Sequence, residues 1–198
     1  MNTQIAALIL FLSVLGYALL GPGFANISSF VAKQGNDTLT IGRKDAPIAI
    51  VHFVDYLNAG SHRINQNLTQ LRAQHLEAKV IVRPLPNKQN PASMRLAKLV
   101  LAHQKTGYSL AIHDALMRQP IELLNVQSLD TVLNRIDPEN TLPAVNLEAD
   151  YLYVDLFWNR SLAHMAGIER APGMILGPEI IDHDAYSVFN LSQMVGNL

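Results

Sequence analysis

Hydrophobic residues near the start of the central region form one continuous run and then recur at helical spacing. The run Ile48–Val54 is apolar and rich in β-branched residues, as expected of a strand buried on both faces. A second apolar run at 80–82 stops at two prolines. Between the runs, apolar residues at helical spacing predict an amphipathic helix over 62–78. This strand, helix and strand require a right-handed crossover and a parallel strand pair.

From residue 91 the pattern changes to helical spacing, with three helices expected before Pro138. The remaining predicted elements are a short strand at 38–41, a helix at 147–166, strands at 174–176 and 179–181, and a helix at 185–196. The last two strands lie too close together for a crossover helix and should be antiparallel. The sequence therefore predicts an α/β protein: a mixed central sheet with helices on both faces and an inserted helical block at about 91–146.

The N-terminal segment differs from the rest of the chain in its pattern of charged and apolar residues. It has no charged residue before Lys33, and positions 5–20 are almost entirely apolar. As a helix this run would span about 24 Å, a little less than the roughly 30 Å hydrocarbon core of a membrane. Two interpretations stay open: a secretory signal cleaved after Ala25, or a retained anchor through residues 5–24. A buried core helix is a third. Without basic residues, the positive-inside rule does not specify an orientation.

These patterns divide the chain into three parts. Residues 1–25 are a signal peptide or membrane anchor, residues 26–37 are a linker of small and polar residues, and residues 38–198 form the folded domain. A chain of 198 residues that is 49% hydrophobic is long and apolar enough for one domain with a sizeable core.

Charge and cysteine content exclude several functions. With 15 Lys plus Arg and 16 Asp plus Glu, the chain has a net charge of −1, and nucleic acid is not an expected partner. The chain contains no cysteine, so it offers no disulfide, thiolate nucleophile or cysteine-ligated metal. No metal site or cofactor is predicted, since Asp182-His183-Asp184 has one imidazole and no third ligand. His52, inside the buried strand, is expected to have a hydrogen-bond partner.

Three stretches of the sequence share a family likeness. They are Gly42-Arg43-Lys44-Asp45-Ala46-Pro47 with the strand that follows it to Tyr56, the helical string Ala111-Ile112-His113-Asp114-Ala115-Leu116-Met117, and the loop 167–177. In this order and spacing they resemble the DsbA-like branch of the thioredoxin fold. The resemblance implies a thioredoxin fold with an inserted helical subdomain, and a cis peptide bond at Ala171-Pro172.

The same resemblance locates a degenerate active site. Where the family has Cys-x-x-Cys, this chain has Asn58-Ala59-Gly60-Ser61. Thiol–disulfide exchange requires a thiolate, and neither an amide nor a hydroxyl can replace it. Disulfide oxidase, reductase and isomerase activities are therefore excluded for this chain alone, and no catalytic residue is predicted.

The family uses the cis-proline loop, opposite the motif, to pair with an extended peptide. The resemblance therefore implies a set of candidate peptide-binding residues: Tyr56, His62, Ala171, Pro172 and Gly173. A purely structural interpretation is that Asn58 or Ser61 caps the following helix, since both residue types are good N-caps. A third feature is an aromatic group on the helix at 147–166, formed by Tyr151, Tyr153, Phe157 and Trp158, which is expected to pack in the core unless part of it binds a partner.

Two functions of different classes follow. The first is a redox-inactive DsbA-like protein of the bacterial periplasm, exported or anchored in the inner membrane. It would bind an envelope protein or an extended peptide, as a structural or assembly module within a larger envelope complex. The alternative is a glutathione-dependent transferase or isomerase that uses Ser61. Whether the chain is an enzyme is left open.

Overall fold

The computed structural model describes residues 39–125, 128–177, 179–181 and 187–197. The predicted signal or anchor (1–25), the linker (26–37) and Asp182-His183-Asp184 lie outside the described residues. Among the residues that are described, no helix is both long and apolar enough to cross a membrane.

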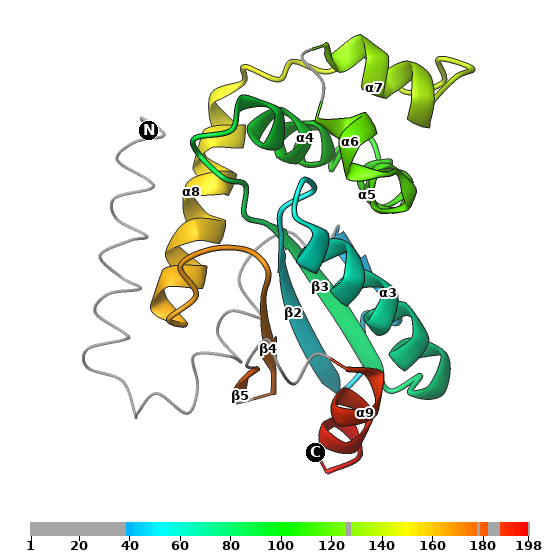
Figure 1. Cartoon of the computed structure of the whole chain (residues 1–198), viewed down its shortest axis with the longest axis vertical. Helices are drawn as coiled ribbons and strands as arrows, with labels where there is room; N and C mark the ends of the chain where they lie inside the picture. The colour runs from blue at the N-terminus through cyan, green and yellow to red at the C-terminus, as the bar shows by residue number, and fades with distance from the viewer. Residues whose placement is uncertain (1–38, 126–127, 178, 182–186, 198) are drawn as a thin grey trace.

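A five-stranded mixed sheet forms the centre of the molecule (Figure 1). Its strands, in the spatial order β1-β3-β2-β4-β5, are β1 (Thr40–Ile41), β3 (Ala78–Pro84), β2 (Ile48–Val54), β4 (Gly173–Leu176) and β5 (Glu179–Ile181). β2 and β3 are parallel, and the β4–β5 pair is antiparallel, as the sequence predicts. β2 also pairs with β4 in antiparallel register, so the most apolar strand lies in the middle.

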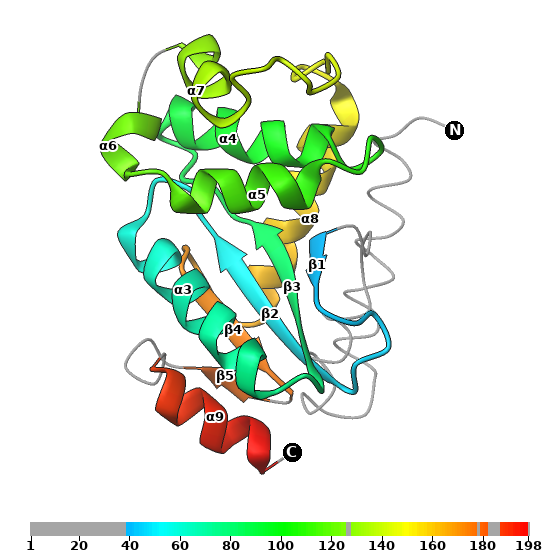
Figure 2. The same ribbon diagram turned by 90° about the vertical axis from the view of Figure 1, so that its right-hand side faces the viewer.

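Helices cover both faces of the sheet, because side chains alternate along β2. Ile50 and Val54 belong to a core that includes residues of α3 (Ala59–Gln74) and α9 (Val188–Gly196). Val51 and Phe53 point the other way, into a smaller core with the C-terminal half of α8 (Asp150–Met165). Figure 2 shows α3 and α8 on opposite sides of the sheet.

The inserted helical region lies above one end of the sheet (Figure 1). It consists of α4 (Pro91–Ala102), α5 (Ser109–Arg118), α6 (Ile121–Leu124) and α7 (Leu129–Ile136). Its apolar residues join the larger core, together with Leu152 and Leu156 from the first half of α8. The helical region and the α3 side of the sheet therefore share one continuous core.

The structure corrects the sequence prediction at α3 and at α8. α3 begins at Ala59 rather than 62, since Asn58 caps it, and ends at Gln74 rather than 78. The buried stripe of α8 runs through Leu152, Leu156 and Ala163. Tyr153 and Phe157 therefore face outward, and these two aromatic residues are about half exposed and do not pack in the core.

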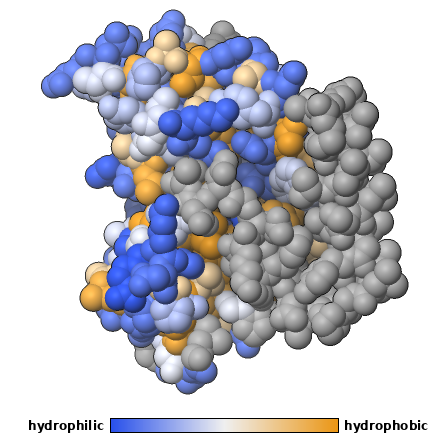
Figure 3. Space-filling model, turned by 180° about the vertical axis from the view of Figure 1, so that it is seen from behind, coloured by the Kyte–Doolittle hydropathy of each residue, from blue (hydrophilic) through white to orange (hydrophobic). Residues whose placement is uncertain are grey.

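Seen from behind, the coloured surface is mainly hydrophilic, with hydrophobic residues in small separate areas (Figure 3).

Candidate functional site

The Asn58-Ala59-Gly60-Ser61 motif forms the start of α3, at the end of the sheet that faces the helical region. Asn58 has an extended backbone, and its Oδ1 accepts hydrogen bonds from the backbone N–H of Gly60 (2.8 Å) and Ser61 (3.2 Å). These bonds satisfy two of the N–H groups that a helix start leaves unpaired. The prediction that a motif residue caps this helix is confirmed, and the residue is Asn58.

The same side chain links the motif to the cis-proline loop. Nδ2 of Asn58 donates to the carbonyl oxygen of Ala171 at 3.4 Å. Ala171-Pro172 is a cis peptide bond, as the family resemblance implies. A Cβ on Gly60 would lie 3.0 Å from Cγ of Pro172, so the helix start and the proline ring are in close contact. Glycine at position 60 therefore allows the proline ring to approach the motif.

We call the partly exposed part of this region the motif face, formed by Asn58, Ala59, Gly60 and Pro172. Ala59 is its most open residue. Its side chains carry no thiol and no titratable group, so the motif face offers shape and hydrogen-bonding groups rather than acid, base or nucleophile.

Ser61 is not an exposed donor. Its side chain is fully buried, and its Oγ accepts a hydrogen bond from the backbone N–H of Asp55 at 3.2 Å. The glutathione-dependent alternative requires a hydroxyl that a substrate can reach, and the burial of Ser61 argues against it.

Below the motif, the buried carboxylate of Asp55 joins three chain segments. Oδ1 accepts from Leu57 N–H (3.0 Å) and from Oγ of Ser93 (2.7 Å), while Oδ2 accepts from Asn87 N–H (3.2 Å). Ser93 lies in the first turn of α4, and Asn87 in the loop after β3. The sequence analysis missed this residue, although an acidic side chain directly after a buried strand was a usable signal.

Tyr56 faces the helical region instead of solvent. Its side chain is fully buried, its hydroxyl donates to Nδ1 of His113 at 3.1 Å, and His113 Nε2 donates to Oδ1 of Asn65 at 3.2 Å. Burial raises the pKa of Tyr56 well above its usual value, with smaller contributions from Asp114 and Asp55. Burial lowers the pKa of His113 to about 4. Both groups are therefore neutral at pH 7, which suits this hydrogen-bond chain.

His62 and Gly173 are also set apart from the motif face. His62 Nε2 donates to the carbonyl oxygen of Tyr56 at 2.8 Å, and it points away from Gly60, since residues two apart in a helix do not face each other. Gly173 is buried, and a Cβ there would collide with Ile168. Of the predicted peptide-binding residues, the structure brings only Ala171 and Pro172 to the motif.

His52 differs from its prediction. It is completely buried between β3 and β4, and neither ring nitrogen has a hydrogen-bond partner among the described residues. Burial, with a smaller effect of His113, lowers its pKa to about 3. No group of three or more histidine or acidic residues in the described part of the chain could hold a metal ion. His52 is thus a neutral core residue at pH 7.

A separate array joins α9 to the end of α3. Oε1 of Glu77 lies 2.7 Å from Nδ1 of His75, and Oγ of Ser192 lies 2.6 Å from Nε2. The order acid, histidine, serine is that of a hydrolase triad. Ser192, however, lies inside α9, where the backbone N–H groups are used by the helix and cannot form an oxyanion site. The array therefore fastens the last helix.

Several solved structures share this arrangement of sheet and helices. The catalytic domain of Proteus mirabilis ScsC matches with a TM-score of 0.65 and 25% identity, over 86% of this chain and 97% of that chain. The chain has a DsbA-like thioredoxin fold. A periplasmic thioredoxin-like protein from Salmonella enterica serovar Typhimurium also matches, with a TM-score of 0.65 and 20% identity. The match covers 84% of this chain and 97% of the Salmonella protein.

A third DsbA-like match is the thiol-disulfide exchange protein alpha-DsbA2 from Wolbachia pipientis, with a TM-score of 0.57 and 19% identity, over 87% of this chain and 96% of that one. No protein-family model matches the sequence, and no curated protein is significantly similar to it. The likeness is one of fold. Because the chain has no cysteine, it cannot act as a thiol oxidoreductase by itself.

Proposed function

We propose that this chain is a redox-inactive DsbA-like protein of the bacterial envelope that binds a protein or an extended peptide through the motif face. The observation that carries the proposal is the side chain of Asn58, which caps α3 and holds the cis-proline loop by one amide group. The site has lost its chemistry, but its two halves remain in contact through Gly60 and Pro172. Such a surface suits recognition.

The envelope location rests on two further observations. Positions 5–20 are almost entirely apolar, as in a signal peptide or anchor. One structural neighbour, from Salmonella enterica, is described as periplasmic. We propose export to the periplasm, with the domain released or held at the inner membrane, and a partner within an envelope assembly. The burial of Ser61 favours this binding role over the glutathione-dependent alternative.

The test is a matched pair of bulky, neutral substitutions on one helix. Ala59→Trp places a large side chain on the motif face, and Ala73→Trp places the same side chain on an exposed position about 20 Å away along α3. Gly60→Arg would be a poor probe, because a Cβ there already crowds Pro172. Tagged proteins with equal melting temperatures would be purified from gently solubilised envelopes of the source organism.

We expect a defined set of envelope proteins to co-purify with the unaltered chain and with Ala73→Trp but not with Ala59→Trp. If both variants retain the same proteins, the motif face is not the interface and the proposal fails. A folded, correctly located chain that retains no protein or peptide would also overturn it.

A further inference from the structure

Positive charge is concentrated in the segments around the motif. Residues 57–63, 85–95 and 160–173 contain five lysines or arginines and one acidic residue, Glu169, in a chain whose net charge is −1. The three segments are far apart in sequence, so the fold brings this charge together.

Arg63 and Arg170 lie on the side of the cis-proline loop. Ala59 and Arg63 are four residues apart in α3 and share one face of the helix. Gly60, three residues before Arg63, contacts Pro172, which follows Arg170 by two residues. Both arginines are exposed, so their guanidinium groups are available to a ligand beside the motif face.

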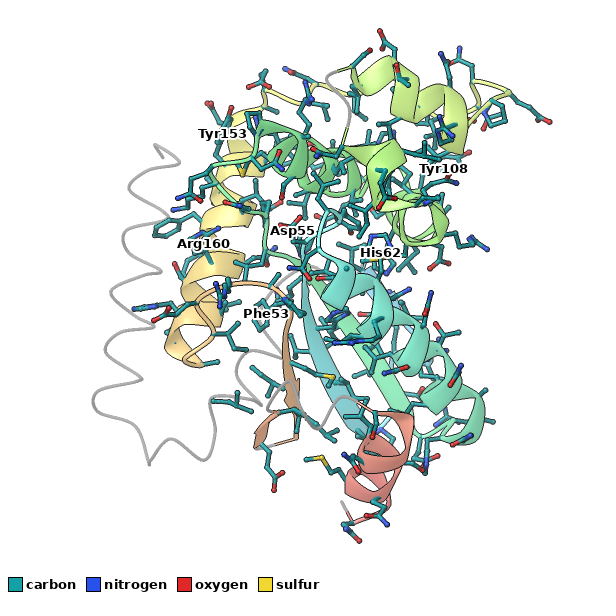
Figure 4. The ribbon with its side chains drawn as sticks, viewed as in Figure 1. Phe53, Asp55, His62, Tyr108, Tyr153 and Arg160 are labelled. Atoms are coloured by element: carbon teal, nitrogen blue, oxygen red, sulfur yellow. The ribbon has the colours of Figure 1, made fainter. Side chains whose placement is uncertain are left out.

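Arg160 of α8 contacts the loop after β3, and Lys88 belongs to that loop. Nη2 of Arg160 donates to the carbonyl oxygen of Pro86 at 2.7 Å, and Lys88 follows as an exposed residue. Asn87 ties this loop to the site through the carboxylate of Asp55. Figure 4 shows Arg160 on α8 and His62 on α3 on opposite sides of Asp55.

The acidic groups nearby do not neutralise this charge. Among the described residues, no ion pair is formed by Arg63, Lys88, Arg160 or Arg170. Asp55 is buried and directs its carboxylate to internal hydrogen bonds. Asp155 of α8 is partly buried, and burial raises its pKa while Lys105 opposes the rise. Glu169 remains as the exposed acid beside Arg170.

We propose that the motif face binds an extended peptide rich in Asp and Glu, held by a basic rim of Arg63, Lys88, Arg160 and Arg170. This inference rests on the proposed function and names the chemistry of its partner. Three of the four cations are arginine, whose planar fork matches a carboxylate in two parallel hydrogen bonds. Single-stranded nucleic acid is disfavoured, since the three segments contain no Phe, Tyr or Trp on which bases could stack.

The experiment measures fluorescence anisotropy with labelled peptides of equal length. One alternates Glu with Ser and Gly, a second has Gln in place of each Glu, and a third has Lys. We expect the Glu peptide to bind at least about tenfold more tightly than the Gln peptide, with affinity that falls as salt is raised, and the Lys peptide not to bind.

Two double variants test where the peptide binds. Arg63→Glu with Arg170→Glu reverses charge on the basic rim, and Arg118→Glu with Arg135→Glu makes the same change at exposed sites on α5 and α7. The first should abolish binding of the Glu peptide and the second should leave most of it. An equal loss of affinity for the Glu peptide in both variants would show an effect of net charge and would contradict binding at the basic rim.

The remaining outcomes separate the two proposals. If the Gln peptide binds as tightly as the Glu peptide and Ala59→Trp abolishes both, the motif face binds peptides but the acidic preference is wrong. If no peptide binds and Ala59→Trp loses no envelope partner, the proposed function itself fails. Rim-dependent binding to anionic phosphatidylglycerol vesicles without any peptide binding would assign the charge to a membrane surface instead.

Discussion

At the scale of single residues, Asn58 has two separable functions. The carboxamide oxygen caps α3, and the nitrogen holds the loop that contains Ala171. Loss of an Asn cap costs about 1 kcal/mol. We expect Asn58→Ala to lower the free energy of unfolding by about 1–2 kcal/mol. Asn58→Asp keeps the hydrogen-bond acceptor and should not lose the part of this free energy that comes from the helix cap.

Urea denaturation measures both changes, and Asn90 provides the control. Asn90 caps α4 through the same pair of hydrogen bonds, to Ala92 and Ser93. Asn90→Ala should therefore cost about 1 kcal/mol, and the excess at Asn58 measures the link to the loop. If Asn58→Asp were as unstable as Asn58→Ala, the cap assignment would be contradicted.

His52 should be replaceable without loss of stability. A buried polar group with no partner costs about 1–3 kcal/mol, and Leu is apolar and of similar size. We expect His52→Leu to raise the free energy of unfolding at pH 7 by about 1 kcal/mol in the same denaturation assay. A marked loss of stability would mean that the imidazole makes a favourable interaction in solution.

Positions 58 and 61 also test whether the motif has a geometry that allows a disulfide. We expect Asn58→Cys combined with Ser61→Cys to close into a disulfide in air, seen as the loss of two hydrogens by intact mass. The helix start should hold the pKa of the thiol at position 58 below the usual value of about 8.5. A double variant that stays reduced under mild oxidant would show that the motif geometry does not allow a disulfide between positions 58 and 61.

At the scale of elements, α9 is fastened to α3 by side chains as well as by packing. His75 directly follows α3 as its C-cap, and its ring lies between Glu77 and Ser192. We expect Ser192→Ala to cost about 1 kcal/mol and to speed hydrogen exchange in α9. Gln193→Ala, at an exposed neighbouring position, is the control and should leave exchange unchanged. Equal effects of the two variants would show that the hydrogen bond is unimportant.

At the scale of the whole molecule, two buried histidines make the fold sensitive to acid. Burial lowers the pKa of His52 to about 3 and that of His113 to about 4, while both return to about 6.5 on unfolding. The unfolded chain therefore binds more protons in acid. Their contribution to stability is full above about pH 6.5 and is lost as pH falls toward 4, by up to about 2.7 kcal/mol per pH unit.

Chemical denaturation across this pH range measures how steeply the free energy of unfolding depends on pH. His52→Leu should reduce this slope by the contribution of one bound proton, because leucine has no group that titrates. An unaltered slope in His52→Leu would mean that this imidazole is already protonated or solvated in the folded chain.

The sequence predicted element order and strand direction correctly, because these depend on local runs such as Ile48–Val54 and on the short spacing of β4 and β5. The site was predicted in outline only. The hydroxyl of Tyr56 finds its partner 57 positions away, and Asn58 finds Ala171 at a separation of 113. Local patterns carry no information about such contacts, so the burial of Tyr56 and Ser61 was missed.

The central place of β2 in the sheet has a consequence for the order in which the chain can fold during synthesis. Ile50 of β2 pairs with Leu176 of β4, which the ribosome adds roughly 125 residues later. At typical rates of elongation this takes on the order of ten seconds, during which one edge of the most apolar strand has no neighbour. Non-local pairing of this kind also slows folding. A nascent chain that stays open this long exposes this strand edge to chaperones until β4 has been made.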